Sequence, residues 1–354
     1  MSRPAGSAQS VERVVRICES AADARTLRLR LLEEIRRAVS FDAYAWLLTD
    51  PETSVGSAPL ADVPCLPELP RLIALKYLTR INRWTSLHAA PAALLHEATG
   101  GDLSRSLLWQ DLQSRYAVSD VASLVFRDRF GCWGFLDLWR SGAAARFGQA
   151  EAAFLGDIAG PVTAALRRSQ ARAFTSGGGS RSTRRPGPVV LLLSPALAVL
   201  RQTPETQEYL RILVPPAEDR PPIPASAYNV AAQLLAVEAG VDGNPPWARV
   251  HMSDGVWVTL RAARIDSAGG SAGSDIAVTI EETTPPERVA LFARAFGLST
   301  RESELLSHLA TGADTRELAH RMFLSEHTVQ DHLKSIFAKT SAHNRRTLLS
   351  RALG

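Results

Sequence analysis

Apolar residues at helical spacing dominate the start of the chain. Leu27, Leu31 and Ile35 recur every four residues, which predicts a helical segment over 11–39. The pattern further predicts a buried strand over 44–48, a helix over 69–81, a β-hairpin over 121–139 and a helix over 149–168. Together these elements predict one α+β domain over 11–170. Residues 1–10 are rich in Ser, Gly and Ala, and we expect them to form a disordered tail.

A change in composition separates this domain from a second one. The stretch Ser176-Gly-Gly-Gly-Ser180 and the Arg- and Pro-containing residues after it carry no apolar pattern, which predicts a flexible linker over 171–187. A second α+β domain is expected over 188–284, with a hairpin turn at Asp254-Gly255. Its predicted elements are a strand over 189–193, a helix over 228–240, hairpin arms over 250–252 and 256–262, and a last strand over 275–281.

The C-terminal segment, 290–354, shows helical periodicity alone. A residue of the N-cap type precedes each of four predicted helices. The first two caps have a glutamate three residues later, which is the spacing of a capping box. The caps are Ser299 (with Glu302), Asp314 (with Glu317), Ser325 and Asn344.

The third of these helices has two different faces. Val329, Leu333 and Ile336 form an apolar stripe, with Phe337 beside them. The opposite, mostly polar face comprises His327, Gln330, Asp331, Lys334, Ser335 and Ala338. Two short helices, a short turn and this longer helix match a helix-turn-helix, whose second element fits the major groove of DNA. The alternative is a generic four-helix unit with a charged surface.

The segments that carry this pattern resemble a known family. They read Leu298-Ser-Thr-Arg-Glu-Ser-Glu-Leu-Leu, then Gly312-Ala-Asp-Thr-Arg-Glu-Leu-Ala, then Leu324-Ser-Glu-His-Thr-Val-Gln-Asp-His-Leu-Lys-Ser-Ile-Phe-Ala-Lys, then Asn344-Arg-Arg. In this order and at this spacing they are similar to the LuxR-type helix-turn-helix. The resemblance implies that the third helix is the recognition helix, that the partner is double-stranded DNA, and that the fourth helix supports a homodimer. It leaves RNA polymerase open as a further partner.

The resemblance also implies roles for individual residues. Gln330, Asp331 and Lys334 would face bases or adjacent phosphates, with Ser335 on the same face. Thr315, Thr328 and Lys339 would position the DNA backbone. Gln330 stands where the family often has Lys, which would exchange a phosphate or guanine contact for an adenine-compatible amide.

The end of the recognition helix departs from the family. Thr340-Ser341-Ala342 replaces the usual Leu-Gly-Val, so the glycine of a left-handed cap is missing. This departure favours an alternative function, a DNA-independent interaction protein whose helix-turn-helix has decayed.

The two upstream domains carry weaker, architectural resemblances. Residues 11–170 resemble a GAF domain, and 188–284 resemble a degenerate PAS domain marked by the Asp254-Gly255-Val-Trp-Val hairpin. Such modules often sense small molecules or hold dimers together. The resemblance therefore implies an effector, a small molecule or a protein, whose identity the sequence leaves open.

Charge and cysteine content bear on the expected DNA affinity and on the cellular compartment. The net charge is +4. The segment from Gly297 to Gly354 contains eight Lys and Arg and six Asp and Glu, so we expect modest and salt-dependent DNA affinity. Only three of 40 basic residues are lysines: Lys76, Lys334 and Lys339. The three cysteines are isolated, and no signal peptide or membrane-length apolar run is apparent, which favours a cytoplasmic protein with reduced thiols.

Motifs of catalysis are lacking. The sequence has no Walker loop, dinucleotide fingerprint, zinc-protease motif or nucleophile elbow, so we expect no enzyme activity, no cofactor and no metal. Cys132 could ligate haem or sense redox, but a core thiol is the simpler interpretation. Likewise Trp46, Trp133 and Trp139 are either pocket or core residues. The expected function is a one-component, dimeric transcriptional regulator.

Overall fold

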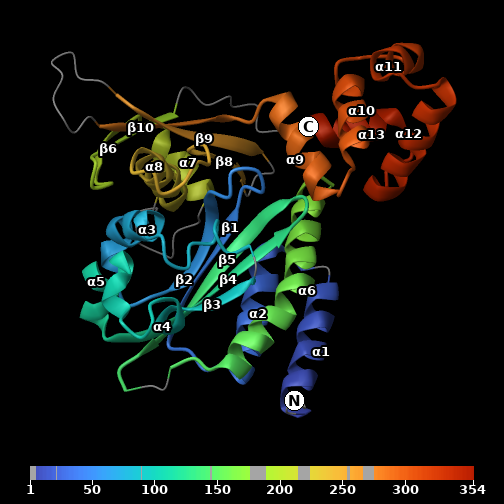
Figure 1. Ribbon diagram of the computed structural model, residues 1–354. Coiled ribbons are helices and arrows are strands. Elements are labelled where there is room, and N and C mark those ends of the chain that lie inside the picture. The colour runs from blue at the N-terminus through green and yellow to red at the C-terminus, as the bar shows by residue number, and fades with distance from the viewer. Residues whose placement is uncertain are drawn as a thin grey trace.

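The computed structural model describes residues 5–20, 22–88, 90–143, 146–175, 189–213, 224–252, 256–265 and 275–354. These residues form two domains built on antiparallel sheets, followed by a C-terminal helical domain (Figure 1). The expectation of an α+β multidomain protein is therefore confirmed.

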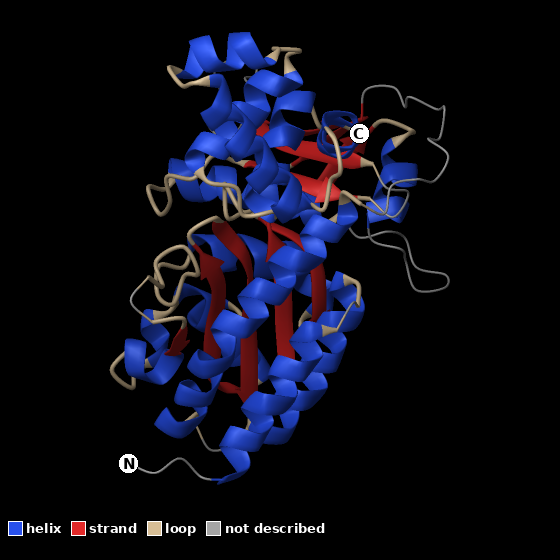
Figure 2. Cartoon of the chain, turned by 90° about the vertical axis from the view of Figure 1, so that its right-hand side faces the viewer, coloured by secondary structure: helices blue, strands red, loops and turns tan. Residues whose placement is uncertain are grey.

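The first domain is a five-stranded sheet with helices on both faces. Its elements are α1 (Ala5–Glu19), α2 (Ala24–Ala38), β1 (Ala43–Thr49), β2 (Gly56–Asp62), α3 (Leu69–Leu78), β3 (Ala92–Leu94), α4 (Leu95–Ala98), α5 (Leu107–Asp111), β4 (Val118–Asp128), β5 (Gly131–Ser141) and α6 (Gln149–Ala173). The strand order is β2-β1-β5-β4-β3, and all neighbours are antiparallel. Helices α1, α2 and α6 lie on one face and α3 and α5 on the other (Figures 1 and 2). Because both faces are covered, β5 is buried along almost its whole length.

The N-terminal helices differ from the sequence-based expectation. The helical segment expected over 11–39 is two helices, because the Asp23 side chain accepts hydrogen bonds from the N–H groups of Arg25 and Thr26 and so starts α2. Helix α1 begins at Ala5, so residues 5–10 are helical where composition predicts a disordered tail. This helix packs against α6 and α2, which explains why it is ordered. The predicted strand over 44–48, the helix over 69–81, the hairpin and the helix from 149 are all present.

The second domain is another five-stranded sheet. Its elements are β6 (Val189–Leu193), β7 (Val199–Gln202), α7 (Thr206–Leu213), α8 (Ala225–Glu238), β8 (Trp247–His251), β9 (Trp257–Arg264) and β10 (Ile276–Glu282). The strand order is β7-β6-β10-β9-β8. Sequence patterns miss β7 and α7. The linker expected over 171–187 is wrong at its start, because α6 continues to Ala173. Its Gly-rich part at 176–180 and the Asp254-Gly255 turn lie outside the described residues.

Helix α8 belongs to the second domain but packs on the first. It lies against α3 and β2, and side chains of both domains share one hydrophobic cluster. Arg83, in the loop after α3, donates from Nη2 to Asp242 Oδ2 at 2.7 Å and to Gln233 Oε1 at 3.0 Å. Both side chains of the Arg83–Asp242 pair are buried. The two sheet domains are therefore one continuously packed unit.

Helix α9 (Pro285–Ala295) connects this unit to the C-terminal domain. Its Phe292 meets Phe174 edge to face, with ring centroids 5.3 Å apart. Phe174 also stacks on Trp257 at 5.1 Å. Since Phe174 follows α6 and Trp257 begins β9, this aromatic cluster holds α9 against both sheet domains.

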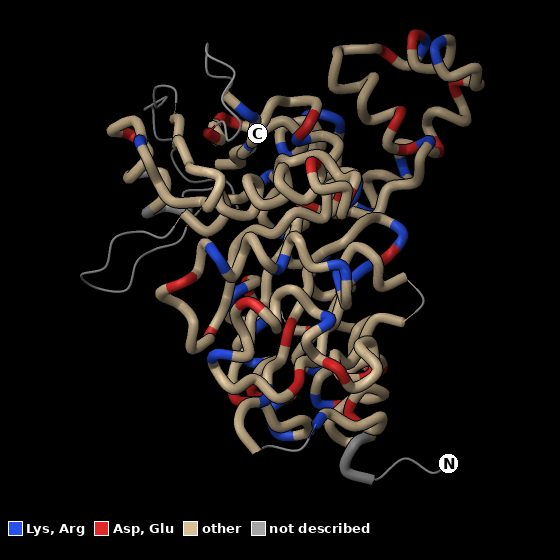
Figure 3. The backbone as a smooth tube through the Cα atoms, turned by 60° about the vertical axis from the view of Figure 1, so that its left-hand side comes forward, with Lys and Arg blue, Asp and Glu red and all other residues tan. Residues whose placement is uncertain are grey.

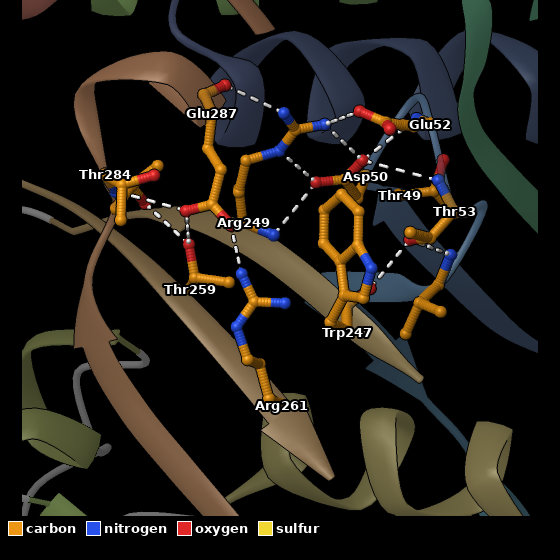
Figure 4. Close-up of polar contacts among 12 residues, drawn as sticks. Thr49, Asp50, Glu52, Thr53, Trp247, Arg249, Thr259, Arg261, Thr284 and Glu287 are labelled. Carbon is orange, nitrogen blue, oxygen red and sulfur yellow. Dashed lines mark hydrogen bonds and ion pairs between the residues drawn. The ribbon is translucent and has the colours of Figure 1, made fainter. Parts of the chain in front are cut away.

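Arg249 on β8 links all three parts of the chain through one buried guanidinium (Figure 4). Its Nε and Nη2 donate to the two carboxylate oxygens of Asp50, just after β1, at 2.7 and 2.9 Å. Its Nη1 donates to the carbonyl oxygen of Glu287, in the first turn of α9, at 2.9 Å. Burial alone would lower the pKa of Arg249, but the charges of Asp50 and Glu52 raise it above its ordinary value. The group therefore stays charged inside the protein.

We predict that Arg249→Met lowers the free energy of unfolding by about 3–5 kcal/mol, because Asp50 is left as a buried charge without its cation. Urea unfolding followed by tryptophan fluorescence measures this, since all seven tryptophans precede the C-terminal helices. Arg115→Met is the matched control: its ion pair with Glu68 is open to solvent, and the expected loss of stability is much smaller than for Arg249→Met. Equal losses in the two variants would contradict the role given to Arg249.

Candidate nucleic-acid interface

Each helix of the C-terminal domain starts at the cap that the sequence predicts. The helices are α10 (Thr300–Ala310), α11 (Thr315–Met322), α12 (Glu326–Thr340) and α13 (Arg345–Leu353). The four cap side chains accept hydrogen bonds from N–H groups three residues later, and the caps are Ser299, Asp314, Ser325 and Asn344. Local sequence therefore fixes where these helices begin.

The turn between α11 and α12 bends at one residue. Phe323 has φ of 56°, in the left-handed region, and the next residue, Leu324, donates its N–H to Ala319 O at 2.9 Å. These contacts close the end of α11, and Ser325 then starts α12. Phe323 itself is 94% exposed. The result is two helices joined by a short turn, as in a helix-turn-helix.

Helix α12 buries one face and exposes the other. Val329, Leu333 and Ile336 are buried against α10 and α11, as the apolar stripe predicts. On the other face, the side chains of His327 and Lys334 are 86% and 74% exposed. Figure 1 shows α12 at the edge of the molecule, away from both sheets. The polar face is therefore accessible to a large partner.

Charges of both signs lie on this exposed face. Asp331, also exposed, accepts from Lys334 Nζ at 3.1 Å and lies 3.3 Å from Nδ1 of His327. The hydrogen bond from Lys334, aided by the neighbouring positive charges, lowers the pKa of Asp331. Acidic and basic positions are mixed along the helices of the whole domain (Figure 3). Gln330 is exposed between these groups and is uncharged.

Two of the predicted DNA-contact residues, Ser335 and Lys339, bind Glu302 of the same domain. The buried carboxylate of Glu302 accepts from Ser335 Oγ and from Lys339 Nζ, both at 2.6 Å. It also accepts from the N–H of Ser299, so it joins the start of α10 to the side of α12. Although burial would raise its pKa, the hydrogen bonds from Lys339, Ser335 and Ser299 lower the pKa of Glu302 to about 2. Ser335 and Lys339 thereby fix the orientation of the recognition helix.

The predicted threonines lie near helix starts. Thr328 is in the first turn of α12, with its Oγ1 2.9 Å from Ser325 Oγ. Thr315 begins α11, and its Oγ1 accepts from Arg345 Nη2 at 2.6 Å. The structure thus gathers Thr328, Gln330, Asp331 and Lys334 on one face of α12, with Thr315 on the neighbouring helix.

The end of α12 has the cap geometry without its glycine. Ser341 takes φ of 51°, and its N–H donates to Phe337 O. Nη1 of Arg351 on α13 donates to the carbonyls of Thr340 and Ser341 at 2.8 and 3.0 Å. Sequence reasoning missed Arg351, whose only signal is an arginine in the last turn of the fourth helix. The helix end is therefore closed, at the cost of a serine in a strained conformation.

Residues 297–352 match the family described as bacterial regulatory proteins, luxR family. Residues 297–352 are a luxR-family helix-turn-helix domain. The luxR-family domain begins at Gly297, directly after α9, and ends inside α13.

Individual relatives match part of the chain. A "Probable csgAB operon transcriptional regulatory protein" of Salmonella typhimurium is 42% identical over 53 residues, 15% of this chain and 24% of that protein. The "Probable HTH-type transcriptional regulator GfsR" of Streptomyces halstedii is 34% identical over 96 residues, 27% of this chain and 34% of that protein. The chain thus spans a quarter to a third of these relatives. Both relatives are named as transcriptional regulators.

Similarity to solved structures is low. The crystal structure of Escherichia coli SdiA covers 98% of this chain and 95% of its own, with 12% identity and a TM-score of 0.35. At that level it does not bear on the fold of the two sheet domains. Among the described helices, none is long and apolar enough to cross a membrane. The described residues also contain no group of three His, Cys, Asp or Glu side chains that could hold a metal.

We predict that Glu302→Gln destabilises the luxR-family domain at neutral pH by about 2–3 kcal/mol, and that the difference from the unaltered protein shrinks as the pH falls from about 4.5 towards 2. The sign follows because a lowered pKa gives stability that is complete above the unfolded-state value and is lost on protonation. Urea unfolding followed by the methyl NMR signal of Met322, buried in this domain, measures the effect, and Met252 in the second domain is the internal reference. A difference independent of pH would contradict it.

We predict that Ser341→Gly stabilises the same domain by about 0.5–1 kcal/mol, because glycine adopts the left-handed conformation without strain. Ala338→Gly, at an exposed position inside α12, should instead destabilise by about 0.5–1 kcal/mol. The Met322 signal reports on both variants. A loss of stability in both would show that Ser341 is not strained.

Proposed function

We propose that the protein is a sequence-specific transcriptional regulator that binds double-stranded DNA through α12. The exposed, hydrogen-bonding face of α12 is the observation that carries this proposal, because the contacts that orient the helix come from its other sides. Gln330, Asp331 and Lys334 would face bases or nearby phosphates. Thr315 and Thr328 would bind the DNA backbone at helix starts, where backbone N–H groups favour phosphate.

Ser335 and Lys339 have a double role in this proposal. Both are held by Glu302, which orients α12 for the groove. Lys339 keeps two further ammonium N–H groups for a phosphate, since an ammonium has three donors. The DNA-binding set is thus Thr315, Thr328, Gln330, Asp331, Lys334, Ser335 and Lys339.

The assembly would be a homodimer. Two recognition helices would enter successive major grooves about 34–36 Å apart and read a pseudo-palindrome. The GAF-like and PAS-like character of the upstream domains belongs to the same proposal, with a sensory or dimer-forming role. RNA polymerase would be contacted only after DNA binding.

The test starts by mapping the binding sites of the protein across its genome and measuring affinity for a recovered duplex. Lys334→Ala should weaken specific binding by about 1–3 kcal/mol and reduce its salt dependence. Asp331→Asn is the matched variant on the same face: removing its negative charge should strengthen binding. Unchanged affinity in both variants, or no duplex bound at low salt, would favour a decayed helix-turn-helix that acts without DNA.

A further inference from the structure

A cavity of about 240 Å³ lies between the first sheet, helix α3 and helix α8, on the sheet face opposite α6. Its walls are mainly aliphatic and aromatic side chains, including Leu47, Ile73 and Phe135. It reaches the surface near Leu66 and Ala61, which are exposed. An apolar cavity of about 150 Å³ is large enough for benzene, so this one has room for about ten non-hydrogen atoms.

One wall carries a polar group without a partner. Asn229, on α8, is 1% exposed, and neither its amide nitrogen nor its amide oxygen has a hydrogen-bond partner among the described residues. Leaving a buried carboxamide unpaired is unfavourable, and a leucine of similar size would avoid the cost. Asn229 therefore offers one donor and one acceptor to an occupant of the cavity.

A second unpaired group lines the same cavity. The indole N–H of Trp139 is buried and has no partner within the described part of the chain. Trp139 and Phe135 point to the same side of β5, four residues or about 13 Å apart. Asn229 lies at the Phe135 end, because it is close to Leu47, which pairs with Phe135 across the sheet. The two unpaired polar groups therefore lie towards different ends of the stretch of β5 that lines the cavity.

The middle of the cavity is polar but neutral. Lys76 Nζ and Asp137 Oδ2 form an ion pair of 2.6 Å, and Ser123 Oγ donates to the other oxygen of Asp137 at 2.7 Å. The positive and negative charges compensate each other, so the walls do not select a charged ligand. They favour a neutral occupant.

We propose that this cavity binds a neutral, unbranched small molecule of about ten non-hydrogen atoms, with a secondary amide at the Asn229 end and a carbonyl-type acceptor at the Trp139 end. The site specifies the sensory part of the proposed function. Binding here is measured directly, without DNA, so it succeeds or fails independently of operator recognition.

The first test uses N-(5-oxohexyl)acetamide as the probe and the full chain as the protein. Isothermal titration calorimetry should show saturable binding below about 10 mM, with a rise in melting temperature. Ala45→Phe, which fills the cavity from β1, should abolish binding. No saturable binding by the unaltered protein, or undiminished binding by a folded Ala45→Phe variant, would overturn the proposal.

The second test separates binding from structure at Asn229. Asn229→Leu should weaken the binding of the probe by at least about fivefold, while the melting temperature of the free protein stays equal or rises. A structural role for Asn229 would lower that temperature instead. A lower melting temperature with unchanged probe affinity would overturn the assignment of Asn229.

The third test compares two tryptophans whose indole N–H groups have no partner among the described residues. Trp139 lines the cavity, and Trp46 is buried on the other face of the same sheet. The unaltered protein should prefer N-(5-oxohexyl)acetamide to N-hexylacetamide by about fivefold. Trp139→Phe should abolish this preference and Trp46→Phe should keep it. Any other pairing of results would overturn the assignment of Trp139.

Discussion

The buried pair of Arg249 and Asp50 is the constraint on which the arrangement of this protein depends. One guanidinium satisfies a carboxylate from the first domain and a carbonyl from the first turn of α9, while its own strand belongs to the second domain. Burying two charges is expensive unless nearly every donor and acceptor is matched. The geometry that matches them fixes three segments far apart in sequence. Hydrophobic packing at the same junction, around Phe174 and Trp257, supplies the non-directional part of the attachment.

In the luxR-family domain, by contrast, the contacts that orient the key helix lie within the domain. Its helices α10 and α13 pack on α9, and α12 makes its orienting contacts inside the domain, through Glu302. The weakly basic surface means that electrostatic attraction to any duplex is modest. In the proposed function, discrimination between DNA sequences would depend on the rigidity with which α12 presents its side chains. A buried carboxylate that binds two side chains of the helix provides that rigidity.

Sequence reasoning succeeded where local chemistry decides the structure. The four caps of the C-terminal helices and the stripe of Val329, Leu333 and Ile336 depend on residues a few positions apart, and all were predictable. The capping box from Thr284 to Glu287 that starts α9 has the same kind of signal and was overlooked. By contrast, Arg249 and Asp50 are 199 positions apart, and nothing in their neighbourhoods indicates that they meet. The dual use of Lys339 is hidden for the same reason.

The three lysines of this arginine-rich chain show how composition and structure combine. Each lies within 3.1 Å of a carboxylate: Lys76 of Asp137, Lys334 of Asp331 and Lys339 of Glu302. Two of the three lysines lie on α12, whereas Lys76 lies in the last turn of α3, so the scarcity of lysine does not by itself distinguish a DNA contact from an internal ion pair.

No residue of α12 lines the cavity, so a ligand would affect the proposed DNA binding through other elements, and α9 lies on one such route. The contacts along that route are defined. Helix α8 forms one wall of the cavity and packs on β9. Strand β9 holds the start of α9, since Arg261 is paired with Glu287 and Thr259 donates to the same carboxylate at 3.4 Å. A ligand whose affinity differs between two positions of α8 would therefore act on α9 through β9. No other described strand both packs on α8 and holds the Glu287 carboxylate.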